Sequence, residues 1–306
     1  MTRWVLIALA HSIDLIGGST VKLGRSVRQA SARWSGFTSE ILHSGLHRVH
    51  YWEGGSGAPV ILIHGFGAGG LPTWLPVARG LAKTHRVIIP DLLWFGDSTS
   101  TAAPSLDTQA AAIQALVEHL VSPGERVDVV GSSYGGFVAL RYGAIEPTRQ
   151  GKLAILGSPG PFFGLDDRLA LLERFEVETP EQIFVPQEPK DVRRLIELAF
   201  HTPPPLPSPL LRDLFMNVFS SYREERTTLL QELEREHQRY QAMKLAPYSA
   251  ALVIWGKHDR VFPAASGEDL AAHLGGEYRE IEDTAHAPQL ERPAPVTHML
   301  REFLKA

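Results

Sequence analysis

The 306-residue chain has 34 acidic and 30 basic side chains, a net charge of −4 and 44% hydrophobic residues. This balance is typical of a globular protein and argues against nucleic acid as a partner. The chain has no cysteine, so disulfides, thiolate nucleophiles and cysteine metal sites are excluded. No apolar run reaches the roughly 20 residues that a membrane span needs.

Residues 1–40 are expected to form an N-terminal helical extension. Its apolar part, residues 4–16, is short for a span and a poor signal peptide. Four basic side chains and no acid lie between Asp14 and Glu40. An apolar helix followed by a basic stretch favours peripheral contact of residues 1–34 with anionic lipid. The alternative is a helix packed on the rest of the protein, so the expected location is the cytoplasm or the membrane surface.

Beyond the extension, short apolar runs alternate with helical patterns. The runs expected to be strands are 58–66, 86–98, 126–133, 151–160, 249–263 and 276–286. Helices are expected over 106–121 and 134–147 and from Pro293 to the end. Continuous Val, Ile and Leu runs separated by helices predict an α/β fold with a mainly parallel central sheet flanked by helices. The two parts of this core are 41–160 and 247–306.

Residues 161–246 have a different pattern, with Leu, Phe, Glu and Arg at helical spacing. They are expected to form a helical cap inserted after the sixth strand. The stretch HTPPPLPSPLL at 201–211 cannot be regular helix, because proline lacks the N–H that the helix needs. Such an insertion should cover the carboxyl edge of the sheet, where open α/β sheets bind ligands.

The stretch VVGSSYGGFVAL at 129–140 begins as a strand, ends as a helix and has two adjacent serines between. Gly131-Ser132-Ser133-Tyr134-Gly135 matches G-x-S-x-G in one register only, with Ser133 at its centre. In this motif a sharp strand-to-helix turn raises the serine hydroxyl above the sheet. Side chains at the two glycine positions should collide with neighbouring backbone. Ser133 is therefore the candidate nucleophile, and Ser132 is a small residue in a crowded turn.

A serine hydroxyl needs a base to remove its proton, and the base needs a carboxylate to orient it. His286 follows the last predicted strand and should lie on the same edge as Ser133. Asp259 follows the preceding strand and is the preferred carboxylate. Asp283 is the competing candidate, but it is too near His286 in sequence to hold the ring from the opposite side.

A tetrahedral oxyanion needs two convergent backbone N–H donors. One should come from Tyr134, directly after the candidate nucleophile at a helix N-terminus. The other should come from Phe66 in the segment HGFG at 64–67. His64 is expected to be a buried structural residue rather than a second base.

Together these motifs resemble the α/β-hydrolase superfamily, in which the order serine, acid, histidine is expected. The matching segments are HGFG, PDLLWFGDS, GSSYGG, WGKHDRVFP and AHAPQLERP, in the family's order over most of 47–306. The insertion resembles that of bacterial family V lipases, which are similar to the membrane-anchored monoacylglycerol lipases. Two positions depart from the family pattern, since Ala285 and Trp94 stand where glycine is common.

The resemblance implies a serine carboxylester hydrolase for apolar acyl esters or monoacylglycerols, acting through an acyl-enzyme without a metal or cofactor. Trp94, Phe162 and Phe163 are expected to contribute to an apolar substrate pocket. A C–C bond hydrolase or an aminopeptidase on the same three residues is an alternative, as is a ligand receptor that hardly turns over. The sequence leaves the oligomeric state open.

Overall fold

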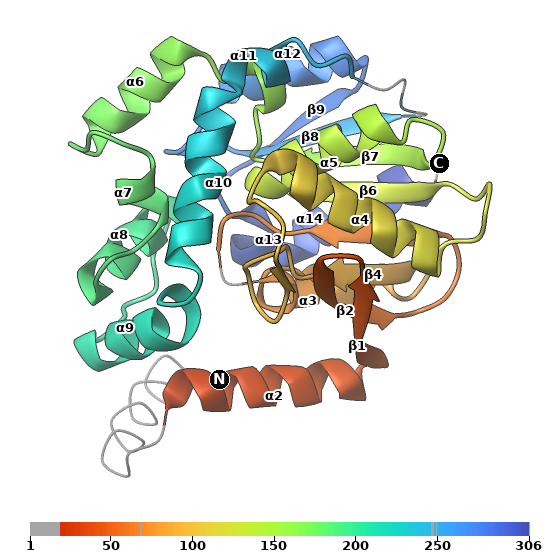
Figure 1. Ribbon diagram of the computed structural model, residues 1–306, viewed down its shortest axis with the longest axis horizontal. Helices are drawn as coiled ribbons and strands as arrows, with labels where there is room; N and C mark the ends of the chain where they lie inside the picture. The colour runs from red at the N-terminus through yellow and green to blue at the C-terminus, as the bar shows by residue number, and fades with distance from the viewer. Residues whose placement is uncertain (1–18, 68, 246–247, 249, 306) are drawn as a thin grey trace.

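The computed structural model describes residues 19–305 except 68, 246, 247 and 249 (Figure 1). Its strands are β1 (Phe37–Ser44), β2 (His47–Gly54), β3 (Pro59–Ile63), β4 (Arg86–Pro90), β5 (Thr99–Ser100), β6 (Val127–Ser132), β7 (Gln150–Leu156), β8 (Ala251–Gly256) and β9 (Glu277–Ile281). They form one sheet in the order β1-β2-β4-β3-β6-β7-β8-β9, with β5 paired to β2. The strands from β4 to β9 along this order are parallel, and β1 and β2 are antiparallel. The mainly parallel sheet predicted from the sequence is confirmed.

Helices cover both faces of this sheet (Figure 1). In the core they are α3 (Gly70–Leu81), α4 (Leu106–Leu120), α5 (Tyr134–Ile145), α12 (Ala264–Leu274), α13 (Pro288–Glu291) and α14 (Pro293–Lys305). Strand β3 is buried throughout, and its successive side chains alternate between two clusters. Ile61 packs with the α4, α5 and α12 side, whereas Leu62 packs with the α3 and α14 side. Period-two alternation between two buried faces explains the unbroken apolar runs in the sequence.

The cap lies between β7 and β8. Its helices are α6 (Leu165–Arg174), α7 (Glu181–Phe184), α8 (Pro189–Ala199), α9 (Ser208–Leu214), α10 (Arg223–Arg235) and α11 (His237–Gln241), with short turns η1 (Gly160–Phe162) and η2 (Phe215–Phe219). Strand β7 is the sixth strand when the two-residue β5 is left out. Residues 201–207 contain no helix, as expected from the prolines, but the expectation is wrong for 208–211. Helix α9 begins at Ser208 and has Pro209 in its first turn, where the missing N–H costs no hydrogen bond. The cap stands at one end of the sheet, with α10 beside the core (Figure 1).

Buried polar groups on α10 connect the cap to the core. Arg226 Nε donates to the Trp94 carbonyl at 2.9 Å, and its guanidinium lies 4.5 Å from the centre of the Phe95 ring. Glu232 accepts a hydrogen bond from the Leu106 N–H at 3.1 Å, at the start of α4, and another from the Tyr240 hydroxyl at 2.6 Å. Because buried polar groups are costly without partners, these bonds fix where α10 can lie on the core.

The N-terminal helix α2 (Thr20–Trp34) packs against the cap helix α9. The Asp213 carboxylate on α9 accepts hydrogen bonds from the Ser19 and Thr20 hydroxyls at 2.6 and 2.7 Å and from the Val21 N–H at 2.7 Å. This carboxylate satisfies a donor of the first helical turn that has no partner within the helix. None of the described helices is long and apolar enough to cross a membrane.

The end of the predicted helical extension differs from the structure. Strand β1 begins at Phe37, so residues 37–40 belong to the sheet, and residues 1–18 lie outside the described chain. Phe37 is opposite Gly54 in the β1–β2 pair, and its ring occupies the space that a side chain at Gly54 would need. This cross-strand packing holds residues 37–40 in the sheet, which a pattern confined to the N-terminal segment does not reveal.

Candidate active site

The turn between β6 and α5 positions Ser133 at the carboxyl edge of the sheet. Ser133 has φ 53° and ψ −123°, a backbone conformation that non-glycine residues rarely adopt. A Cβ at Gly131 would lie 2.4 Å from the Gly135 carbonyl oxygen, and one at Gly135 would lie 2.4 Å from the Ile63 carbonyl oxygen. Both glycines are thus required by close backbone approach, as the motif predicts.

The two adjacent serines have different environments. The Ser132 hydroxyl is buried and accepts a hydrogen bond from Gln289 Nε2 at 3.1 Å. The Ser133 Oγ lies 2.8 Å from His286 Nε2. Only Ser133 therefore has a base within reach.

His286 is held from its other side by Asp259. The Asp259 Oδ2 lies 2.9 Å from His286 Nδ1, and its Oδ1 accepts the N–H groups of Val261 and Phe262 at 2.7 and 3.2 Å. Both side chains are largely buried, with 10% of His286 and 2% of Asp259 exposed. Because the carboxylate accepts from Nδ1, Nε2 carries the lone pair and can accept the Ser133 proton. The structure brings these three residues together in the arrangement of nucleophile, base and orienting acid.

Asp283, the competing carboxylate, lies elsewhere. Its side chain is 65% exposed, and its Oδ2 accepts a hydrogen bond from Arg292 Nη2 at 3.2 Å. The position next to His286 Nδ1 is filled by Asp259 instead.

The HGFG segment after β3 packs directly on the turn that carries Ser133. A Cβ at Gly65 would lie 2.9 Å from the Ser133 Cβ, so this position requires glycine. The rings of Phe66 and Tyr134 meet edge to face, with centroids 5.5 Å apart. Tyr134 is the first residue of α5, where a backbone N–H has no intrahelical acceptor. The two residues expected to hold an oxyanion thus lie against each other on the two loops that meet at Ser133.

His64 is fully buried beneath this site. Its Nδ1 donates to the Gly65 carbonyl at 2.7 Å, and its Nε2 accepts the Leu92 N–H at 2.9 Å. Burial lowers the pKa of His64 below the ordinary imidazole value, because removal from water disfavours the charged form. Both ring nitrogens are used within the protein, so His64 is a structural residue.

A cavity of about 620 Å³ opens above Ser133, between the core and the cap. Its core wall includes Phe66, Phe137, Leu140 and Phe262, and further apolar lining residues come from the cap. The cap residues are Phe163, Leu165, Leu171, Phe184, Leu230, Leu233 and Met243. A mostly apolar cavity with Ser133 in its wall can hold an extended apolar ligand next to this serine.

Of the three residues predicted to line the pocket, Phe163 does so, and Phe162 and Trp94 lie elsewhere. Phe163 lines the cavity and meets the Phe262 ring edge to face at 4.9 Å. Phe162 packs instead on His273 of α12 at 5.4 Å. Trp94 is buried in the core with φ 65° and presents its carbonyl to Arg226. The positive φ explains why glycine is common at this position, and burial of the ring keeps it away from the cavity entrance.

One wall of the cavity is polar, and no pattern in the sequence indicated it. Helices α10 and α11 contribute Glu234, Arg235, His237, Gln238 and Gln241, and α6 contributes Arg168, which pairs with Glu234. In sequence these residues resemble the solvent-exposed side of any charged helix, and only the packing of the cap turns them toward the site.

Comparison with known proteins places this geometry in a family. The family described as "alpha/beta hydrolase fold" matches residues 58–293. The chain belongs to the alpha/beta hydrolase fold family. The matched range contains the whole cap and most of each part of the predicted core.

Individual relatives of this hydrolase family member fall into more than one activity group. The monoacylglycerol lipase ABHD6 of Bos taurus is 26% identical over 258 residues, covering 80% of this chain and 74% of the relative. The 2-hydroxymuconate semialdehyde hydrolase of Pseudomonas sp. (strain CF600) is 27% identical over 273 residues, covering 87% and 93%. The crystal structure of a membrane phospholipase A, described as a bacterial virulence factor, has a TM-score of 0.75 at 28% identity, covering 98% of this chain and 96% of that one.

The lowered pKa of His64 predicts acid destabilisation. Below pH 6.5, the ordinary pKa of an imidazole, the unfolded chain binds a proton that folded His64 does not, so the free energy of unfolding decreases as pH falls. His64 contributes at most about 1.4 kcal/mol per pH unit to the slope of the free energy of unfolding against pH. We expect urea unfolding between pH 7.5 and 5 to show a shallower pH dependence for His64→Gln than for the unaltered protein. His47 and His237, whose pKa values are also lowered by burial, remain in both proteins. Equal slopes would show that His64 is not the group involved.

Proposed function

We propose that this hydrolase is a serine carboxylester hydrolase for apolar acyl esters, including monoacylglycerols. The observation that supports this most directly is the line of hydrogen bonds Ser133–His286–Asp259 at the wall of a largely apolar cavity. A serine with this support attacks carbonyl carbon, and an ester is the carbonyl substrate with a good leaving group.

In the proposed reaction the Ser133 Oγ attacks the ester carbonyl while His286 Nε2 takes its proton. Asp259 keeps the Nδ1 proton in place and stabilises the imidazolium that forms. The N–H groups of Phe66 and Tyr134 hold the oxyanion of the tetrahedral intermediate. His286 then returns the proton to the leaving alcohol. A water molecule, activated by the same imidazole, releases the acid from Ser133.

The two walls of the cavity favour an ester with one apolar and one polar end. Apolar side chains surround Ser133, and the polar wall on α6, α10 and α11 offers hydrogen-bond donors and acceptors. An acyl chain fits the first environment, and the hydroxyls of a glycerol fit the second. The names of two relatives, a monoacylglycerol lipase and a phospholipase A, agree with a lipid ester as substrate.

A C–C bond hydrolase is the second candidate, because the relative from Pseudomonas sp. is named for hydrolysis of 2-hydroxymuconate semialdehyde. Parallel assays with p-nitrophenyl acyl esters, 1-monoacylglycerols and 2-hydroxymuconate semialdehyde distinguish ester hydrolysis from C–C bond hydrolysis. A higher kcat/KM for the esters supports the proposal, and a higher value for the semialdehyde contradicts it. Absence of turnover on all three would favour a receptor.

The adjacent serines provide a matched pair of variants. We expect Ser133→Ala to lower kcat for p-nitrophenyl butyrate by a factor on the order of 10⁴ or more, because the nucleophile is lost. Ser132→Ala should retain most activity and lose about 1 kcal/mol of stability, since only its bond to Gln289 is removed. Steady-state rates and thermal unfolding measure both effects. An inactive, folded Ser132→Ala protein would contradict the assignment.

The cavity walls should set the preferred acyl length. Phe184→Ala widens the cavity and should shift the kcat/KM optimum toward longer p-nitrophenyl esters, whereas Leu233→Trp narrows it and should shift the optimum toward shorter ones. One methylene in an apolar pocket changes binding by about 1–3 kcal/mol, so the shift should be graded. Phe162→Ala is the control, because Phe162 packs on His273 outside the lining. An unchanged profile in both cavity variants would show that the cap does not select the chain.

We also propose that the N-terminal segment contacts anionic membranes. Residues 1–18 lie outside the described chain, but α2 exposes Leu23, Val27 and Trp34, which are 48%, 61% and 91% exposed. At spacings of four and seven these three lie on one face of the helix. Lys22 and Arg28 are exposed on the same helix. Exposed apolar side chains among cations suit the interface of an anionic bilayer.

Introduction of negative charge on this face tests the contact. The double variant Leu23→Asp/Val27→Asp should reduce sedimentation with phosphatidylglycerol vesicles by about tenfold or more, because carboxylates are repelled by the anionic surface. Hydrolysis of a soluble short-chain ester should be unchanged. Leu169→Asp is the matched control, since Leu169 is 51% exposed on the cap helix α6. Equal vesicle binding by the double variant and the unaltered protein would exclude α2 as the contact.

A further inference from the structure

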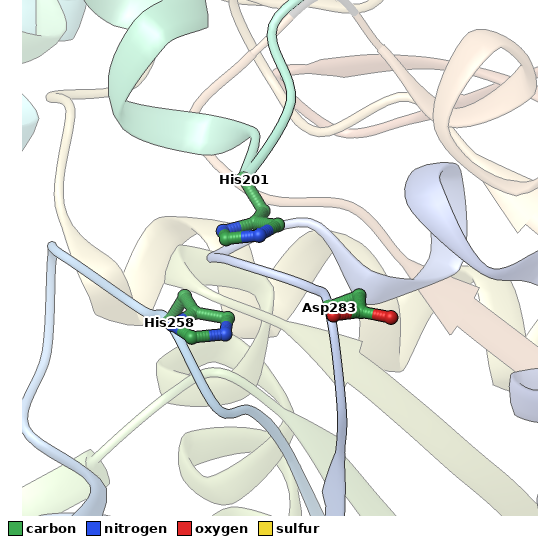
Figure 2. A group of neighbouring side chains, drawn as sticks. All are labelled: His201, His258 and Asp283. Carbon is green, nitrogen blue, oxygen red and sulfur yellow. The ribbon is translucent and has the colours of Figure 1, made fainter.

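Three side chains with metal-ligand chemistry meet at the junction between cap and core (Figure 2). His201 follows α8 in the cap, His258 follows β8, and Asp283 follows β9. One nitrogen or oxygen from each of the three lies within 4.8 Å of the other two. The cluster therefore joins the cap to the two core loops that also bear Asp259 and His286.

The backbone around this cluster is held by hydrogen bonds between the same segments. The Glu291 carboxylate accepts the His201 N–H on one oxygen and the Ala285 N–H on the other, each at 2.7 Å. The Ala287 N–H donates to the Ala199 carbonyl at 3.1 Å, and the His258 N–H donates to Thr284 at 2.8 Å. The three side chains are thus presented from a connected frame.

The side chains themselves leave ligand atoms available. Among the described residues, the Nδ1 of His201 is buried and has no hydrogen-bond partner. The rings of His201 and His258 are stacked, with centroids 4.1 Å apart and planes at 16°. Asp283 uses Oδ2 to accept from Arg292. A buried imidazole nitrogen without a partner is costly, and an ion bound there would remove that cost.

We propose that His201, His258 and Asp283 form a binding site for a divalent transition-metal ion such as Zn²⁺. Two imidazoles and one carboxylate suit Zn²⁺, whereas Mg²⁺ and Ca²⁺ prefer all-oxygen sites. In a tetrahedral site with bond lengths of about 2.0–2.2 Å, two ligand atoms lie about 3.3–3.6 Å apart, so any pair near the 4.8 Å limit must close by about 1 Å on binding. A solvent molecule completes the tetrahedron.

Binding requires one ring to turn. The nitrogen lone pair lies in the plane of the imidazole, so two stacked rings cannot both direct a lone pair at one ion. The His258 side chain is exposed and is held by the stack with His201, whereas His201 is partly buried and its N–H is bound to Glu291. The metal-bound form therefore has His258 rotated out of the stack.

A second cluster, His50, Asp91 and Asp97, lacks this capacity. The Asp91 oxygens already accept bonds from Gly70 N–H at 2.7 Å, His50 Nδ1 at 2.7 Å and Asp97 N–H at 3.1 Å. Because both Asp91 oxygens already accept hydrogen bonds within the protein, this carboxylate stabilises the fold and is not available to a metal ion.

The proposed ion would hold the cap to the core, and we call this link the clamp. It joins the cap at His201 to the residue before Asp259 and to the loop that leads to His286. It takes no part in the ester chemistry, for which the sequence analysis expected no metal. No local spacing in the sequence signals it, because its ligands come from three separate segments.

Zinc titration of the full chain tests the site. Protein stripped with EDTA is titrated calorimetrically with ZnCl₂ and, separately, with MgCl₂. We expect one Zn²⁺ per chain with a micromolar or tighter Kd and no heat of Mg²⁺ binding. His201→Ala, His258→Ala and Asp283→Asn should each weaken Zn²⁺ binding more than tenfold. His298→Ala removes an exposed histidine paired with Glu302 and should leave binding unchanged.

Hydrogen exchange tests the clamp. Zn²⁺ should slow amide exchange in residues 199–202 and 283–287 of the unaltered protein, and should not do so in His258→Ala, whose exposed side chain can be removed without loss of fold. Circular dichroism checks that fold. Zinc affinity that survives all three ligand variants, or that is lost in His298→Ala, would overturn the site. Unchanged exchange with zinc bound would overturn the clamp.

Discussion

The left-handed backbone of Ser133 is the constraint on which the rest of the site depends. A non-glycine residue at φ 53° costs about 1–3 kcal/mol and persists only where its surroundings determine it. Here the Ser133 N–H donates to the Leu156 carbonyl of β7 at 2.8 Å, and Gly131 and Gly135 let strand and helix approach closely. The conformation directs the Ser133 hydroxyl to His286 at the cavity wall and leaves the Ser132 hydroxyl buried against Gln289.

Sheet order then determines which loops can reach that hydroxyl. Strands β3, β6, β7, β8 and β9 are successive neighbours and run parallel, so their carboxyl ends lie along one edge. The loops after β3, β8 and β9 bring the HGFG segment, Asp259 and His286 to Ser133. Gly157, after β7, has φ 53°, and a Cβ there would lie 3.4 Å from His286 Nδ1. A side chain in that backbone conformation would be strained right beside the Asp259–His286 pair.

The cap is fixed to this edge by buried charge rather than by apolar packing alone. Arg226 reaches the Trp94 carbonyl, and burial lowers its pKa to about 10. Glu232 binds the start of α4 and the Tyr240 hydroxyl, whose pKa is raised by burial and by that carboxylate. Groups of this kind are costly unless every partner is present, so they permit few alternative positions of the cap. The cavity between cap and core is consequently a defined space with one apolar and one polar wall.

The sequence by itself determined the alternation of strands and helices, the cap's place in the chain and Ser133 as the centre of the elbow. These follow from periodicity, proline positions and a local glycine pattern, all of which act over a few residues. It also placed Asp259 and His286 after the last two long strands, and so on the edge that Ser133 shares. The short distance along the chain between Asp283 and His286 already favoured Asp259 as the carboxylate. Only the tertiary structure decided that Trp94 turns into the core and that His201 lies against the loops after β8 and β9. Each of these depends on side-chain direction and on contacts between distant segments, and no local pattern in a single sequence encodes them.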